Sequence, residues 1–212
     1  LDVSYVSNIS QFGDPDVVII PGSKNTISDL LWMRQNGLEG KILRHAAKGG
    51  IVFGICGGYQ MLGQSISDPT GAEQKGTVRG MGLLPVTTVF EQEKRRTRVS
   101  GRFAKVGGAL AEMSGVCYEG YEIHMGRTVL SKGTVPLVYM EEEGEQRQDG
   151  AQSDHVYGCY MHGIFDMSET VKTFLAAVLR KKGIDPSKIT VRDRNAYKEE
   201  QYDRLASIVR EN

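Results

Sequence analysis

Short apolar runs alternate with helical patterns over the first 65 residues of the chain. The run VVII at 17–20 is continuous, as in strands that are buried on both faces of a parallel sheet, and IVFGI at 51–55 has the same character. The alternation of apolar and polar residues in LDVSYV at 1–6 predicts one more strand, beside 17–20. Helices are expected between and after these strands, over 26–35, over 38–48 and from Cys56 to about Ser65.

The expected helix ends carry their own signals. Thr26, with Asp29 three residues later, resembles a capping box at the start of the first helix. Gly37 is the expected end of that helix, and Gly49 and Gly50 follow the second one.

The middle of the chain has a different pattern. Residues 66–150 contain short β-like runs between glycines and charged segments, and we interpret them as strands and loops: LLPVTTVF, TRVSGRF, VCYEGYEIH and VPLVYM. The polar stretch 141–154 predicts a solvated loop or a hairpin excursion. A strand pattern returns in HVYGCYMHGIF at 155–165 and stops at His162.

Helical patterns occupy the last part of the sequence. Ser168 is the expected cap of SETVKTFLAAVLRKKG, whose basic last turn and Gly183 suit a helix C-terminus. A final amphipathic helix is expected over about 195–210, with apolar residues on one face: Tyr202, Leu205, Ile208 and Val209.

The order strand, helix, strand, tight turn, helix predicts an α/β fold, with an open, mostly parallel sheet and helices on both faces. We expect residues 1–212 to form a single domain. Active sites in such folds lie at the carboxyl ends of the strands, and Cys56 follows directly after the strand at 51–55.

Charge balance, cysteine content and the length of apolar stretches exclude several classes of function. The 26 basic and 26 acidic residues balance, so the sequence predicts no nucleic-acid partner. The three cysteines match neither a disulfide framework nor a metal site, and no stretch has the length of a membrane span or the pattern of a signal peptide. We therefore expect a cytoplasmic protein without membrane contact or a bound metal. The start without methionine, in the middle of a strand pattern, suggests a fragment of a longer chain.

Cys56 is the candidate nucleophile. The segment Gly54-Ile55-Cys56-Gly57-Gly58 has the form G-x-nucleophile-x-G, a sharp turn from strand to helix that exposes a reactive side chain. The helix start favours the thiolate form, and the Gly57 amide offers half of an oxyanion hole. The alternative is a small buried apolar cysteine, with glycines that only allow close helix packing.

The nucleophile needs a base, and His162 at the end of the last strand pattern is the best candidate. His124 in GYEIHMG competes for this role, whereas His45 and His155 are expected at the surface. The turn PGSKNT at 21–26 follows a buried strand, so its amides are positioned to complete the oxyanion hole unless it is a plain turn. The sequence contains no P-loop and no dinucleotide fingerprint, so no nucleotide is expected to bind this chain.

The segments VVIIPGSKNTISDL, GICGGYQMLG, GYEIHMG and GCYMHGIF together resemble the class I, triad-type glutamine amidotransferase domain at the C-terminus of cobyric acid synthases. The resemblance implies a flavodoxin-like fold and a thiol glutaminase, in which Cys56 attacks glutamine and His162 transfers the proton. It places the oxyanion hole at Gly57 and the Gly22-Ser23 turn, and glutamine contacts at Gly58 and Gln60.

The same resemblance implies a partner. Ammonia passes to an N-terminal synthetase domain of the same polypeptide, which uses ATP and Mg to amidate corrinoid carboxylates, from adenosylcobyrinic acid a,c-diamide to cobyric acid, in cobalamin biosynthesis. No cofactor is implied for the glutaminase domain itself. That synthetase domain, and usually one more strand of the sheet, precedes the corresponding segment in the family.

One departure affects the catalytic triad. Most glutaminases of this class carry glutamate two residues after the catalytic histidine, where this chain has Ile164. Glu122, Asp166 or a residue of a partner domain remain as alternatives for orienting His162. Glu122 and His124 alternate toward one face, where they either line the substrate or ammonia route or form a solvated ion pair.

The missing glutamate keeps a second function open, a catalytically weak glutaminase-like module that docks on a partner synthetase and regulates it. A third hypothesis is a different cysteine hydrolase on the same fold, such as a peptidase.

Overall fold

The computed structural model describes residues 1–142, 144–192 and 194–211, without the side chains of 92–95, 194, 195 and 211. A four-stranded sheet in this part of the chain contains β1 (Val17–Ile20), β2 (Ile51–Ile55), β10 (Val156–Cys159) and β9 (Ala151–Ser153), in the order β1-β2-β10-β9. β1, β2 and β10 are parallel, and β9 is antiparallel to β10. The carboxyl ends of β1, β2 and β10 therefore meet at one edge of the sheet.

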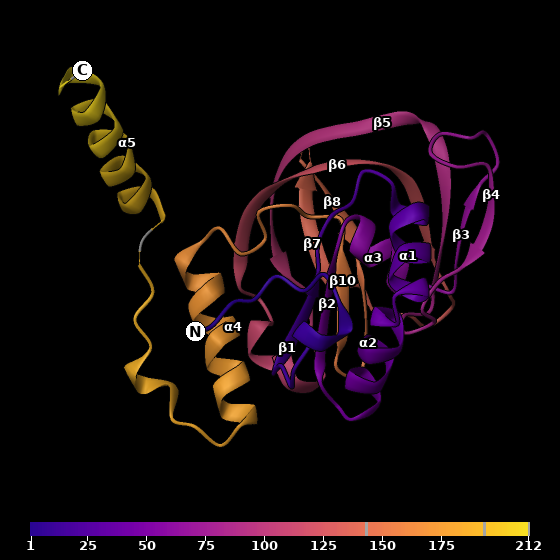
Figure 1. Ribbon diagram of the computed structural model, residues 1–212, viewed down its shortest axis with the longest axis horizontal. Helices are drawn as coiled ribbons and strands as arrows, with labels where there is room; N and C mark the ends of the chain where they lie inside the picture. Colours follow the sequence, from indigo (N-terminus) through magenta and orange to yellow (C-terminus); the bar gives the residue numbers. More distant parts are fainter. Residues whose placement is uncertain (143, 193, 212) are drawn as a thin grey trace.

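Helices cover both faces of this sheet. α1 (Thr26–Gln35), α2 (Leu38–Ala47) and α3 (Gly57–Leu62) lie on one face, and α4 (Ser168–Lys181) lies on the other (Figure 1). Successive side chains of β2 point to opposite faces of the sheet and so contribute to the hydrophobic core on each face. Val52 lies in the core with Ile27 on the α1–α3 side, and Phe53 lies in the core with Phe174 on the α4 side. The predicted α/β architecture, with a mostly parallel sheet between helices, is confirmed.

A second sheet occupies most of the middle of the chain. Its path is β4-β3-β5-β7-β8, and β6 pairs with β5 outside this path. The strands are β3 (Ser65–Asp68), β4 (Gly76–Arg79), β5 (Val86–Phe103), β6 (Cys117–Leu130), β7 (Val138–Glu142) and β8 (Glu145–Asp149). β5 and β6 form a long antiparallel ribbon that curves across the molecule (Figure 1). Short 3-10 helices are η1 (Ile9–Gln11), η2 (Gly108–Met113) and η3 (Pro186–Lys188).

Of the two alternatives for 141–154, the hairpin excursion is confirmed, because β7 and β8 are antiparallel neighbours, and the solvated loop is wrong. β8 and β9 lie in this stretch, and Asp149 and Ala151 are both buried. Asp149 accepts a hydrogen bond from the Tyr160 amide, and Arg147 pairs with the buried Glu122, whereas Gln146 and Gln148 are exposed. A polar composition therefore did not mean that the whole stretch lies in solvent. The strand that was predicted to stop at His162 is also shorter than expected, since β10 ends at Cys159.

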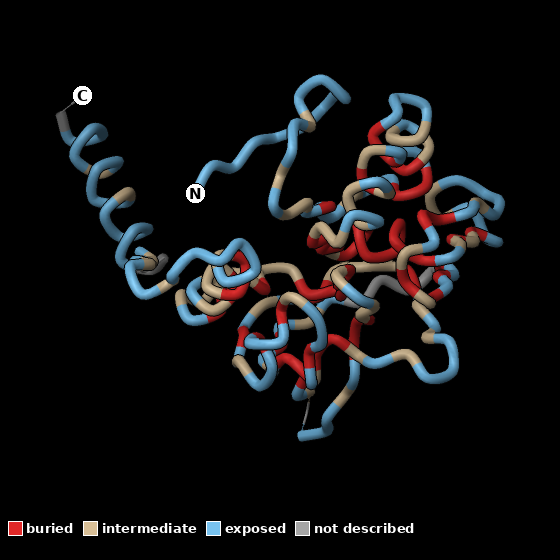
Figure 2. The backbone as a smooth tube through the Cα atoms, turned by 90° about the horizontal axis from the view of Figure 1, so that it is seen from below, coloured by how far each residue is buried: buried red, intermediate tan, exposed pale blue. Residues whose placement is uncertain are grey.

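Residues 1–6 do not form the predicted strand. They are extended and exposed, with Leu1 at 94% and Tyr5 at 95% of full exposure (Figure 2). In the described part of the chain β1 pairs only with β2, so residues 1–6 do not add a strand at the other edge of β1.

Several helix ends also differ from the prediction. The cap of α1 is Asn25, without a side-chain cap, and the Thr26 hydroxyl instead donates to Glu73. α3 ends at Leu62, because Ser65 already begins β3. The residue that caps α4 is Met167 rather than Ser168.

α5 (Arg194–Glu211) forms the predicted final helix, but it extends away from both sheets (Figure 1). Its expected apolar face is exposed to solvent, with Leu205 at 59% and Val209 at 68% (Figure 2). None of the helices in the described part of the chain combines the length and the apolar character that a membrane span requires.

Candidate active site

Cys56 lies on the predicted sharp turn between β2 and α3. Its backbone has φ of 52° and ψ of −110°, a left-handed conformation that is rare outside glycine and that often marks a functional residue. Both flanking glycines are required for packing. A Cβ on Gly54 would lie 2.7 Å from the Tyr59 amide nitrogen, and one on Gly58 would overlap the carbonyl oxygen of Ile20.

The loops after β1 and β10 converge on this turn. A Cβ built on Gly22, after β1, would lie 2.8 Å from Cε1 of His162 and 3.6 Å from Cβ of Cys56. The nucleophile candidate, the base candidate and the glycine turn therefore meet at the carboxyl edge of the parallel sheet, although His162 lies more than a hundred residues after Cys56 in the sequence.

The Gly57 amide acts on the Cys56 thiol, and a second amide lies close to Gly57. A Cβ on Gly57 would lie 2.8 Å from the amide nitrogen of Ser23, so the amides of these two residues are close neighbours. The Ser23 hydroxyl donates to Asp29 and accepts a hydrogen bond of 3.0 Å from the Asn25 amide, which holds the turn in place. Two neighbouring amides are the groups that an oxyanion hole uses, and their role as one stays a prediction.

Burial determines the protonation state of Cys56. The side chain is buried, and its thiol lies 3.5 Å from the Ile123 carbonyl oxygen, to which it donates. Burial raises the pKa of Cys56 to about 11, the Gly57 amide lowers it, and the carboxylates of Asp149, Glu73 and Glu122 raise it further. The expectation that the helix start favours the thiolate is therefore wrong for the resting site, because desolvation outweighs the amide.

His162 complements this thiol. Burial, with a smaller effect from the nearby His124, lowers the pKa of His162 below its ordinary value. A neutral imidazole beside a protonated thiol is the starting state that general-base catalysis requires.

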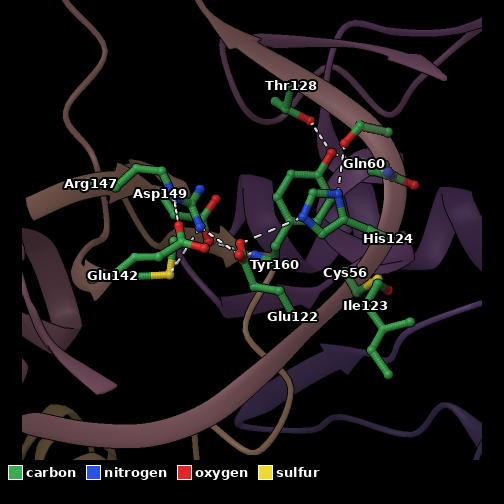
Figure 3. A network of polar contacts seen from close by, with 12 residues as sticks. Cys56, Gln60, Glu122, Ile123, His124, Thr128, Glu142, Arg147, Asp149 and Tyr160 are labelled. Atoms are coloured by element: carbon green, nitrogen blue, oxygen red, sulfur yellow. Dashed lines mark hydrogen bonds and ion pairs between the residues drawn. The ribbon is translucent and has the colours of Figure 1, made fainter. Parts of the chain in front are cut away.

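Glu122 does not orient His162. Its fully buried carboxylate accepts a 2.5 Å hydrogen bond from Nη2 of Arg147, and Nε2 of His124 lies 3.5 Å away from it (Figure 3). Burial alone would raise the pKa of Glu122, but these two partners lower it. Among the residues whose side chains the structure describes, no carboxylate lies within ion-pair distance of the His162 ring; the Asp166 carboxylate lies over Gly163.

His124, the competing base, lies inside the same buried network. Its ring stacks on Tyr160 with centroids 3.6 Å apart, and its Nδ1 lies 2.8 Å from the Gly126 carbonyl oxygen (Figure 3). Gln60 is also part of the network, because its amide group donates to the Tyr160 hydroxyl at 3.1 Å. The structure thus gives Gly58 and Gln60 packing and hydrogen-bonding roles, and their contact with glutamine stays a prediction.

A chamber of about 420 Å³ adjoins the network, with polar lining groups that include Tyr59, His124, Asp149 and Tyr160. Asp149 accepts a hydrogen bond of 2.8 Å from the Tyr160 amide, and burial raises the pKa of Asp149 to about 6. Arg147, Asp149 and Tyr160 were not predicted as site residues from the sequence. The sequence offers one signal for the first two: charged residues alternate with glutamines in EQRQD at 145–149. Because the whole segment is polar, this alternation does not stand out as a strand pattern.

The remaining histidines are half-buried rather than at the surface, and both lie outside the site. Nε2 of His45 lies 3.1 Å from the Ile51 carbonyl oxygen, and His155 lies against Gly49.

The fold and this site define a class of protein. A crystal structure of a glutamine amidotransferase superposes with a TM-score of 0.58 at 16% identity, covering 87% of this chain and 88% of that one. The structure of PurLQS from Thermotoga maritima gives a TM-score of 0.61 at 18% identity, covering 84% and 85%. These similarities show that the chain has the class I glutamine amidotransferase fold.

The sequence comparison is more specific. The chain belongs to the CobB/CobQ-like glutamine amidotransferase domain family, whose model matches residues 1–170. It is 51% identical to the cobyric acid synthase of Ruminiclostridium cellulolyticum and 42% identical to that of Lachnoclostridium phytofermentans, with 99% of this chain covered in each case. The chain spans only 41% and 43% of the length of these relatives, so they contain further domains.

Proposed function

We propose that this chain hydrolyses glutamine to glutamate and ammonia through a thioester on Cys56. The observation that carries the proposal is the convergence of Cys56, His162 and the Gly22 turn on one point, where a Cβ on Gly22 would lie within 3.6 Å of both side chains. Family membership supports the same reaction class.

The chemistry proceeds in two steps. The neutral His162 ring takes the thiol proton while the sulfur of Cys56 forms a bond to the amide carbon of the glutamine side chain, and the amides of Gly57 and Ser23 stabilise the oxyanion. Collapse of this intermediate breaks the carbon–nitrogen bond, and the imidazolium returns its proton to the leaving ammonia. Water, deprotonated by His162, then cleaves the thioester to glutamate and restores the thiol.

The raised pKa of Cys56 affects the timing of the first step. Since the resting thiol is protonated, proton transfer to His162 accompanies attack on glutamine rather than preceding it. The Gly22 turn borders both side chains, which supports a transfer within the site.

We further propose that the ammonia serves an ATP- and Mg-dependent synthetase domain of a longer cytoplasmic polypeptide, which amidates corrinoid carboxylates on the route to cobyric acid. The names of the relatives and the short share of their length that this chain covers support this assignment. The free state of Cys56, Cys117 and Cys159 suits a reducing compartment.

Hydrolysis should lose activity on the acid side with a midpoint below pH 6.5, the ordinary imidazole value, because burial lowers the pKa of His162 and only the neutral ring accepts the proton. The measurement is kcat/KM for glutamine against pH, with circular dichroism at each pH as the control for folding. A midpoint at or above 6.5 would contradict the assignment of His162 as the base.

A chloroketone analogue of glutamine tests the proposed function directly. We expect rapid labelling of Cys56, found by peptide mass spectrometry, because the bound analogue holds its electrophilic carbon at the thiol while His162 takes the proton. The exposed Cys117 in the same molecule should react only slowly. Excess glutamine should protect Cys56, whereas γ-glutamyl peptides should not. Labelling of Cys56 no faster than that of Cys117 would favour the alternative, a docking module with weak catalysis. That alternative is motivated by the lack of a carboxylate beside His162 among the described residues.

A further inference from the structure

His162 is held in place by aromatic contact. The ring of Tyr121 in β6 stacks on the His162 ring with centroids 5.1 Å apart and an angle of 7° between the planes. Burial and the nearby His124 both lower the pKa of the His162 ring. No carboxylate among the described residues forms an ion pair with this ring. The usual device for orienting a catalytic imidazole is a carboxylate on the second ring nitrogen, whereas the described group in contact with this ring is the stacked Tyr121.

The backbone reinforces the stack. Tyr121 and His162 form an isolated antiparallel bridge, in which the Tyr121 amide donates to the His162 carbonyl at 3.0 Å and the His162 amide donates to the Tyr121 carbonyl at 2.9 Å. Both backbone polar groups of each residue are thus paired with the other. The position of the imidazole is consequently fixed relative to β6 and not only to β10, which ends three residues before it.

The same segment also contacts the nucleophile. Two residues after Tyr121, the Ile123 carbonyl oxygen accepts the hydrogen bond from the Cys56 thiol. Between them, the side chain of Glu122 points into the protein and is held by Arg147, which anchors the segment (Figure 3). Residues 121–123 therefore position the thiol and the imidazole from one rigid piece of strand.

We propose that Tyr121 is a positioning residue for His162, and that its ring takes the place of the third triad member. This proposal rests on the proposed glutaminase function. Stacking leaves the ring edge unobstructed, so a ring nitrogen remains available to the Cys56 proton while rotation of the imidazole is prevented. The ring of Tyr121 also excludes water from one face of His162, which helps to keep the imidazole neutral.

The test replaces Tyr121 in the full chain by Phe, Leu and Ala. Tyr121→Phe keeps the stack and should retain kcat within about twofold, whereas Tyr121→Leu and Tyr121→Ala should lower kcat about 10- to 100-fold with KM for glutamine nearly unchanged, since small misplacements of a catalytic group cost rates of this order. In both aliphatic variants the acid-side midpoint of kcat/KM should also move up toward 6.5, because water reaches the ring. Tyr197→Ala in α5 is the matched control, since both tyrosines are 44% exposed.

The outcomes separate the two proposals. An unmodified chain that neither hydrolyses glutamine nor labels at Cys56 overturns the proposed function. If the unmodified chain is active, wild-type kcat in Tyr121→Leu overturns the positioning role, as does a rise in KM at unchanged kcat, which would make Tyr121 a substrate contact. A loss in Tyr121→Phe equal to that in Tyr121→Ala would assign the effect to the hydroxyl and also overturn it. Thermal unfolding of each variant shows whether a loss of rate reflects a loss of folded protein.

Discussion

Glutamine hydrolysis should fall by at least about 10³-fold when Cys56 is replaced by alanine, because removal of a nucleophile eliminates the covalent route and leaves only binding and the oxyanion amides. Glutamate release in a coupled assay gives the rate. Stability should change little, since alanine keeps the Cβ and the small volume at this position. If the ammonia serves a synthetase domain as proposed, the same variant of that longer polypeptide should still use free ammonia.

Cys117→Ala is the matched control for this variant. Cys117 is exposed at the start of β6 and lies away from the Gly22 turn, so glutaminase activity should stay at the wild-type level. Equal activity of the Cys56 and Cys117 variants would contradict the thioester mechanism, and only the fold assignment would stand.

Of the variants described here, Gly58→Ala should lower the free energy of unfolding the most, by at least about 2 kcal/mol, because overpacking a close contact forces backbone shifts. The new methyl group would overlap the carbonyl oxygen of Ile20 and lie 2.7 Å from its carbonyl carbon, in the backbone of β1. Urea unfolding followed by circular dichroism measures the change, and activity should fall with it, since α3 carries Cys56 at its start.

Gly40→Ala supplies the comparison. Gly40 lies in α2, where an added Cβ meets nothing within 4 Å, so alanine should stabilise the helix by about 0.5–1 kcal/mol. A Gly58 variant as stable as the wild type would show that α3 does not sit on β1 as closely as the structure places it.

The parallel half of the fold could be predicted from the sequence because its signals are local. The strands at 17–20 and 51–55 and the helix at 26–35 have the predicted bounds, since continuous apolar runs and glycine stops are properties of each segment alone. The turn at Cys56 was predictable for the same reason, because glycines spaced closely around one nucleophile, directly after an apolar run, are typical of a sharp strand-to-helix turn.

The second sheet and the surroundings of His162 depend on contacts between distant segments. Nothing in GYEIHMG indicates that Tyr121 bridges to His162, since this pairing joins residues 41 positions apart through one isolated bridge. Arg147 likewise looked like a residue of a solvated loop, although its guanidinium neutralises a fully buried carboxylate. Sequence patterns predict which residue types are reactive or apolar, but charge pairing across strands becomes visible only in three dimensions.

The protonated state of the Cys56 thiol has a chemical consequence beyond turnover. With a pKa of about 11, the thiol is almost entirely protonated at pH 7. Peroxides and other oxidants attack thiolates far faster than thiols, so the idle enzyme keeps its sulfur in the reduced form during oxidative stress. Damage would then concentrate in molecules that are turning over, where the proton has already left the sulfur.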